Sequence, residues 1–113
     1  MSSMNVALPV TADGQVDHSW GRAPRVAVAA VDEGQVVGWQ EFAVGWDQLH
    51  DEGTEGGHHA RIATFLRDHH VDVVAAGHMG APMVEMLRRM GIATLLGVTG
   101  DARSAAVSAA AGQ

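Results

Sequence analysis

Short apolar runs and helical segments follow one another in this chain in an order that few architectures accommodate. The expected strands lie at residues 5–10, 25–31, 36–44, 71–76 and 92–96. The expected helices lie at residues 58–69, 83–90 and 101–110. The turn Asp32-Glu33-Gly34-Gln35 joins the second and third strands and predicts a β-hairpin, whereas the later strands are joined by helices. Helical crossovers give parallel pairing, so we predict an α/β fold with one mixed sheet and helices on both faces.

The size and composition of the chain indicate one globular domain. With 113 residues and 47% hydrophobic residues, it can bury a core, and we place the domain at residues 5–112 after a disordered lead at residues 1–4. There is no cysteine, no apolar run of about 20 residues and no visible signal peptide, so we expect a cytoplasmic protein. The formal net charge of -6 argues against nucleic acid and anionic membranes as partners.

Four loops are expected at the carboxyl end of the parallel strands, where ligands of open α/β sheets usually bind. These loops are residues 11–23, 45–57, 77–80 and 97–100. The same end collects most of the imidazoles, namely those of His18, His50, His58, His59 and His78. His69 and His70 are expected at the opposite end, at a helix C-terminus.

Two of these histidines are the best candidates for ligands. His58 and His59 point about 100° apart on a helix, and we favour His58 because it borders the glycine pair Gly56-Gly57. His78 lies between glycines after a buried strand, where a ligand can approach backbone and ring closely. Glycine-rich turns before a helix also offer free backbone N–H groups to an anion.

The methionine and tryptophan side chains are mostly interpreted as core. Met83, Met86 and Met90 recur at helical spacing, but Met79 lies in a loop and is kept as a candidate ligand. We expect the tryptophan at position 39 to pack on the sheet. Those at positions 20 and 46 either cap the core, which we favour, or wall a pocket.

Several segments together carry a family resemblance. They are residues 6–10, the segment 19–24, the helix start Gly56-Gly57-His58, residues 71–77, and the segment from Gly91 to Gly100. In this order they resemble the dinitrogenase iron–molybdenum cofactor biosynthesis family, the NifX-like and NifB C-terminal-like domains. The resemblance implies a three-layer, ribonuclease-H-like fold with a five-stranded mixed sheet. It also implies binding or carriage of iron–sulfur or iron–molybdenum cofactor precursors rather than turnover.

The resemblance extends to individual residues and includes two departures. His58 matches the histidine after the glycine pair, and Gly77 and Gly80 match the strand–helix turn. Family members often have His-Phe-Gly where this chain has Ser-Trp-Gly at residues 19–21, with His18 one place earlier. The turn here also holds His78 and a methionine, where less coordinating residues are expected.

We therefore expect a non-enzymatic carrier of an iron–sulfur or iron–molybdenum-type cluster, with cluster donor and acceptor proteins as partners. The expected cofactor-binding residues are His18, Gly57, His58, Gly77, His78, Met79 and Gly80, with His58 and His78 as metal ligands.

Three alternatives remain open. One is a simple divalent-metal site of His18, His58 and His78, because imidazole suits zinc, nickel and copper. Another is a protein-interaction module that uses exposed tryptophans. An enzyme is disfavoured, because residues 5–10 lack the carboxylates of a magnesium nuclease and no Gly-x-Ser-x-Gly pattern occurs.

Overall fold

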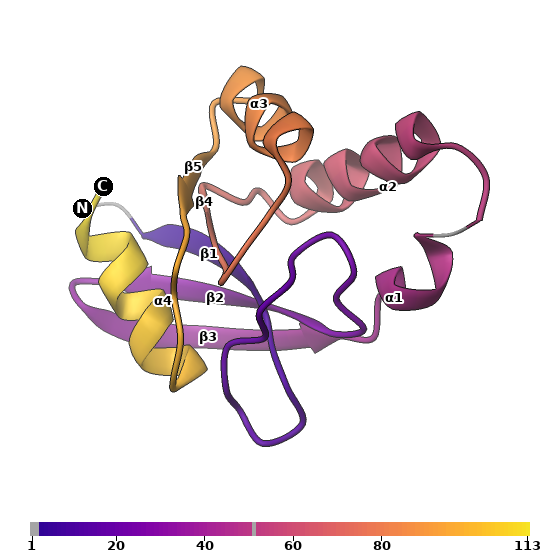
Figure 1. Cartoon of the computed structure of the whole chain (residues 1–113). Helices are drawn as coiled ribbons and strands as arrows, with labels where there is room; N and C mark the ends of the chain where they lie inside the picture. The colour runs from indigo at the N-terminus through magenta and orange to yellow at the C-terminus, as the bar shows by residue number, and fades with distance from the viewer. Residues whose placement is uncertain (1–2, 51) are drawn as a thin grey trace.

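A computed structural model describes residues 3–50 and 52–113 of the chain, shown in Figure 1. The strands are β1 (Met4–Pro9), β2 (Val26–Asp32), β3 (Gln35–Phe42), β4 (Val73–Ala75) and β5 (Ala93–Leu95). The helices are α1 (Trp46–Leu49), α2 (Glu55–Asp68), α3 (Ala81–Arg89) and α4 (Ala102–Ala111).

The strands form one mixed sheet in the order β3-β2-β1-β4-β5. β2 is antiparallel to both of its neighbours, whereas β1 pairs parallel with β4 and β4 pairs parallel with β5. The hairpin between β2 and β3 closes through Glu33 and Gly34, both with positive φ (51° and 78°), as a twisted two-residue turn requires. The predicted hairpin and the parallel pairing of the last two strands are confirmed.

Side chains alternate along the central strands between two apolar cores. Val26 and Val28 of β2 pack in the core beneath α2 and α3, whereas Ala27 and Ala29 pack in the core beneath α4. Figure 1 shows α2 and α3 grouped on one side of the molecule and α4 apart from them. Helices therefore cover both faces, which confirms the α/β prediction and explains why β2 and β4 are almost continuously apolar.

The tryptophans at positions 20 and 46 cap the first of these cores. Trp20 is fully buried and Trp46 nearly so, and their rings meet edge to face with centroids 5.1 Å apart. The cap interpretation is confirmed, and the expectation of exposed tryptophans for an interaction module is wrong. Trp39 packs against the second core as expected, with the Arg103 guanidinium 4.6 Å from its ring centroid.

Two segment boundaries differ from the sequence-based expectation. Met4, assigned to a disordered lead, begins β1 because it pairs with Val31 at the end of the β1–β2 ladder. The first two residues of that lead lie outside the described residues. The expected loop at 45–57 contains α1 and the first turn of α2, which begins at Glu55 instead of position 58. The cause is Thr54, whose side chain accepts a hydrogen bond from the Gly57 N–H (3.0 Å) and caps the helix.

Within the part of the chain that the structure describes, no helix is both long and apolar enough to cross a membrane.

Candidate functional site

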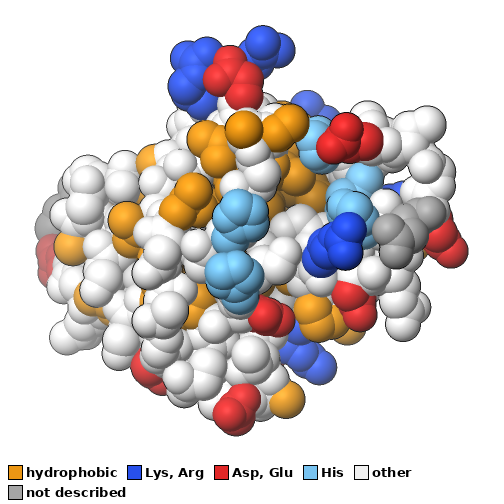
Figure 2. All heavy atoms as spheres, in the orientation of Figure 1, with side chains coloured by type: hydrophobic (Ala, Val, Ile, Leu, Met, Phe, Trp, Pro, Cys, Tyr) orange, Lys and Arg blue, Asp and Glu red, His pale blue; other side chains and the backbone are white. Residues whose placement is uncertain are grey.

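The four loops at the carboxyl end of the parallel strands meet and are hydrogen-bonded to one another, as the sequence predicts. The joining backbone bonds are Trp20 N–H to His78 O (3.1 Å), Trp46 N–H to Ala23 O (3.0 Å), Gly97 N–H to Gly77 O (3.0 Å) and Val16 N–H to Gly100 O (2.8 Å). Five of the seven histidines lie in these loops or at the adjoining start of α2. Figure 2 shows imidazole side chains gathered on this face.

Residues 17–21, here called the strap, bring His18 against His78. A short parallel bridge pairs Ser19 with His78. The His78 N–H donates to the His18 carbonyl oxygen (2.7 Å), and the Trp20 N–H donates to the His78 carbonyl oxygen (3.1 Å). The two exposed imidazole rings are nearly parallel, at 9°, with centroids 5.8 Å apart. Two residues distant in sequence are thus fixed side by side by backbone contacts.

Gly77 makes this approach possible. A Cβ atom at this position would lie 2.8 Å from both the Nδ1 atom and the carbonyl oxygen of His18. Both distances are shorter than real Cβ contacts, so only glycine allows the strap to lie this close to the end of β4. The sequence identified Gly77 as a site residue, and the structure gives it a steric role.

His58 is buried, and both of its ring nitrogens have hydrogen-bond partners. Nε2 lies 2.7 Å from the carbonyl oxygen of Gly21 in the strap, and Nδ1 lies 2.7 Å from a guanidinium nitrogen of Arg61. The side chain is only 3% exposed. Because α2 begins at Glu55, His58 lies one and two turns before the buried residues Ile62 and Leu66, on the inward face of the helix.

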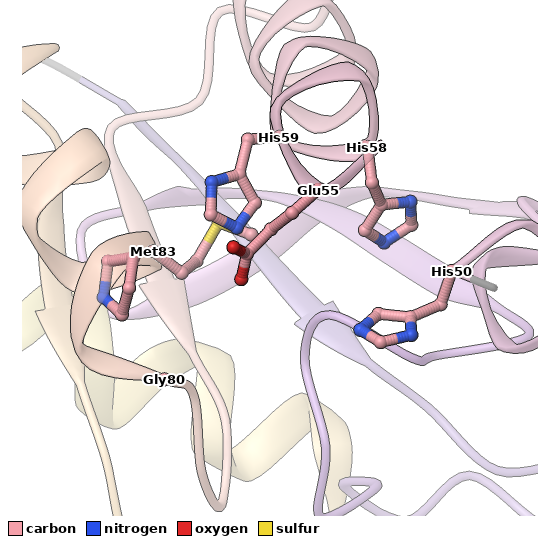
Figure 3. Close-up of a pocket in the computed structure, with 7 residues that line it drawn as sticks. His50, Glu55, His58, His59, Gly80 and Met83 are labelled. Carbon is pink, nitrogen blue, oxygen red and sulfur yellow. The ribbon is translucent and has the colours of Figure 1, made fainter. Parts of the chain in front are cut away.

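A pocket of about 370 Å³ opens between α1, α2 and α3. Its lining residues are His50, Glu55, His58, His59, Gly80, Pro82 and Met83. Figure 3 shows the His59 ring and the Glu55 carboxylate extending from α2 toward Met83, with His50 beside His58. The rings of His50 and His58 meet edge to face, with centroids 5.1 Å apart. His58 and His59 both line the pocket, but His58 is buried whereas His59 is half-buried.

The loop at residues 77–80 separates the strap from this pocket. His78 contacts the strap, while Gly80, two residues later, lines the pocket and caps α3. Met79 between them is buried (5% exposed) in the core, so its thioether is directed away from solvent. Gly57 lies in the first turn of α2 and donates its N–H to the Thr54 cap.

The remaining two histidines lie at the other end of α2, as expected. His69 packs between the rings of Phe42 and Phe65, with centroids 4.4 and 4.5 Å away. His70 follows with a positive φ of 52° and is exposed.

The loop that precedes α4 is fixed by its N-cap. Asp101 accepts hydrogen bonds from the N–H and the hydroxyl of Ser104, both at 2.9 Å, and these bonds lower the pKa of the Asp101 carboxyl. A bridge between Gln15 and Asp101 ties this loop to residues 11–23.

No three or more histidine or carboxylate side chains among residues 3–50 and 52–113 are grouped so that they could hold one metal ion. His18, His58 and His78, which the sequence suggested as a divalent-metal site, therefore do not form such a group. The imidazoles are instead divided between the strap side, where His18 lies beside His78, and the pocket, which His50, His58 and His59 line.

Sequence reasoning missed three pocket residues, namely Glu55, Pro82 and Met83. His58 and His59 both line the pocket, so its lining does not decide between them. Their burial differs because His58 lies four positions before the buried Ile62, on the same helix face, whereas His59 points about 100° away.

Comparison with known proteins agrees with this architecture. The sequence model of the family described as "Dinitrogenase iron-molybdenum cofactor" matches residues 3–112. None of the curated proteins matches the chain. Among solved structures, the crystal structure of PH0822 is similar, with a TM-score of 0.75 and 20% sequence identity over 97% of this chain and 91% of that chain. At this identity the structural likeness shows the fold, and the family match covers nearly the whole chain. The chain therefore belongs to the dinitrogenase iron–molybdenum cofactor family.

Proposed function

We propose that this protein is a non-catalytic carrier that transiently holds an iron–sulfur or iron–molybdenum-type cluster. The cluster is cargo, held by imidazoles at the carboxyl edge of the sheet. The observation that carries the proposal is the donor set: the exposed rings of His18 and His78 lie side by side, the half-buried ring of His59 lines a pocket of about 370 Å³, and the described residues contain no three-donor group for a single ion. The family to which the chain belongs is named for the iron–molybdenum cofactor.

The donor set favours a preassembled cluster over a bare ion. A protein site for one zinc ion usually supplies three or four ligands. A cluster carries its own bridging sulfides, so one or two imidazoles from the protein suffice to hold it. The pocket volume is also far larger than the ~30 Å³ that one water molecule occupies in the liquid.

We assign the ligand role to the imidazoles that solvent reaches. His18 and His78 stand in parallel on the strap side of the loop at residues 77–80, and His59 stands on the pocket side. The lone pair of an imidazole lies in its ring plane, so parallel rings aim at two points rather than at one ion. We infer that such a pair binds two different metal atoms of one cluster. Gly77 lets the strap lie close to the end of β4, and Gly80 lines the pocket.

Weak holding suits a carrier. The chain has no cysteine, so no thiolate competes to retain iron permanently. Imidazole ligation at an open edge leaves the cluster accessible to a donor and an acceptor protein, which are the partners that this function requires.

The alternatives that the sequence left open find less support. A simple divalent-metal site lacks its three-donor group in the described residues. An interaction module that uses exposed tryptophans lacks them, because Trp20 and Trp46 are buried.

The test is anaerobic loading of the purified protein with a cluster assembled from ferrous iron and sulfide. After gel filtration, bound iron and sulfide are quantified and the visible absorption spectrum is recorded. We compare the wild type with the His18→Ala/His78→Ala double variant and with His59→Ala. The matched control is His70→Asn, at the far end of α2, where asparagine tolerates the positive φ.

The proposal expects iron and sulfide in equal amounts, with charge-transfer bands that the control keeps and the double variant loses. Retention of zinc or nickel without iron or sulfide would instead indicate the divalent-metal alternative. A wild-type protein that emerges colourless and metal-free would refute the carrier proposal.

A further inference from the structure

We propose that His58 is a positioning residue of the cargo site, one that holds the strap in place, and not a ligand of the cluster. The inference rests on the proposed function, because it concerns the same site. It reverses the role that the glycine-pair resemblance implies for this histidine.

The hydrogen bonds of His58 leave its ring no lone pair for a metal. The Gly21 carbonyl oxygen can only accept, so Nε2, 2.7 Å away, carries the proton. The Arg61 guanidinium can only donate, so Nδ1, 2.7 Å away, supplies its lone pair to that bond. A metal ligand needs one ring nitrogen with a free lone pair. In this arrangement, neither nitrogen has one.

The bond to Gly21 connects α2 to the strap. Gly21 follows His18 by three residues, and Trp20 between them donates its N–H to the His78 carbonyl. His58 also lies against Trp46, with ring centroids 6.5 Å apart, and Trp46 packs on Trp20. The hydrogen bond from His58 to the Gly21 carbonyl therefore holds the strap, which places His18 beside His78.

Exposure separates the two roles. His58 is 3% exposed, whereas His18 and His78 are exposed and can meet an incoming cluster. Removal of a residue that orients a metal ligand, without itself binding the metal, typically lowers metal affinity 10- to 100-fold. A large loss of cargo on mutation of His58 would therefore not by itself identify a ligand.

A pair of substitutions distinguishes the roles. Glutamine carries a donor and an acceptor on one planar amide, so His58→Gln can donate to Gly21 and accept from Arg61, yet an amide is a poor ligand for iron–sulfur clusters. His58→Ala loses both bonds. The readouts are cluster retention, amide hydrogen exchange of the Trp20 N–H that reports the strap, and circular dichroism to establish that each variant is folded.

We expect His58→Ala to lower cluster affinity roughly 10- to 100-fold and to speed exchange of the Trp20 amide, and His58→Gln to restore most of both. Loss of cargo in both folded variants with a protected Trp20 amide would overturn the inference and make His58 a ligand. Unchanged cargo and unchanged exchange in His58→Ala would overturn it as well. If the wild type holds no cluster, the carrier proposal fails, but amide exchange still tests the positioning role.

Discussion

A methyl group at position 77 has no room in this structure, which makes Gly77→Ala the sharpest test of how the strap is held. The added Cβ would lie 2.8 Å from the His18 carbonyl oxygen and from its Nδ1 atom. The strap must move away, because the contact at the oxygen is to backbone. Two backbone hydrogen bonds depend on the present spacing, His78 N–H to His18 O (2.7 Å) and Trp20 N–H to His78 O (3.1 Å).

The size of the effect follows from these contacts. Each backbone hydrogen bond contributes about 0.5–1.5 kcal/mol net, and alanine lowers the entropy of the unfolded chain by the equivalent of about 0.4–1 kcal/mol. We therefore expect Gly77→Ala to reduce the free energy of unfolding by about 1–2 kcal/mol. Separation of His18 from His78 should also reduce cluster retention.

Urea denaturation measures the stability change, and amide exchange at Trp20 reports the strap. The matched control is Gly56→Ala, in the first turn of α2, where an added Cβ meets nothing within 4 Å. Because alanine is the better helix former, this control should be stabilising by about 0.5–1 kcal/mol. The reasoning is refuted if Gly77→Ala is as stable as the wild type and keeps its Trp20 amide protected.

Three further predictions concern the elements that support the site. Thr54→Ala removes the cap bond to the Gly57 N–H and should lower the free energy of unfolding by about 1 kcal/mol in urea, whereas an unchanged midpoint would contradict the cap. Leu87→Ala, at a fully buried position of α3, should cost about 2–5 kcal/mol in the same assay, and a smaller loss would mean that α3 packs loosely. The pKa of Asp101 is lowered by its bonds to Ser104, so its stabilisation is complete above pH 3.8 and is lost as the pH falls toward the lowered value. The free energy of unfolding of Asp101→Asn should therefore depend less on pH in this range than that of the wild type. The same pH dependence in both proteins would contradict the Asp101 cap.

The fold could be predicted from the sequence because its local signals agree with one another. The Glu33-Gly34 turn predicts the antiparallel pairing of β2 with β3, and a helical crossover predicts the parallel pairing of β4 with β5. The continuous apolar runs agree with strands that are covered on both faces. The ends of the helices were harder to predict from the sequence. The glycine pair at 56–57 suggested a helix start, whereas the Thr54 cap places that start three residues earlier. Helix caps depend on one side-chain bond, which hydrophobic periodicity does not report.

The location of the site could be predicted from the sequence, but the arrangement of its side chains could not. Strand direction sufficed to bring His18, His78 and the start of α2 to one edge. Which ring faces inward depends on helix phase: His58 shares the inward face of α2 with Ile62 and is buried, whereas His59 is half-buried, and both line the pocket. The close approach of the strap to Gly77 is a long-range contact that sequence spacing does not encode.

The central claim is that imidazoles of this face bind iron atoms of a cluster. The most direct measurement is pulsed electron paramagnetic resonance of the protein loaded anaerobically with a reduced cluster, which detects nitrogen nuclei coordinated to iron. We predict strong imidazole nitrogen couplings in the wild type and in His70→Asn, and their loss when His18, His59 and His78 are all replaced by alanine. A bound cluster without nitrogen couplings, or with couplings that survive this triple substitution, would contradict the assignment.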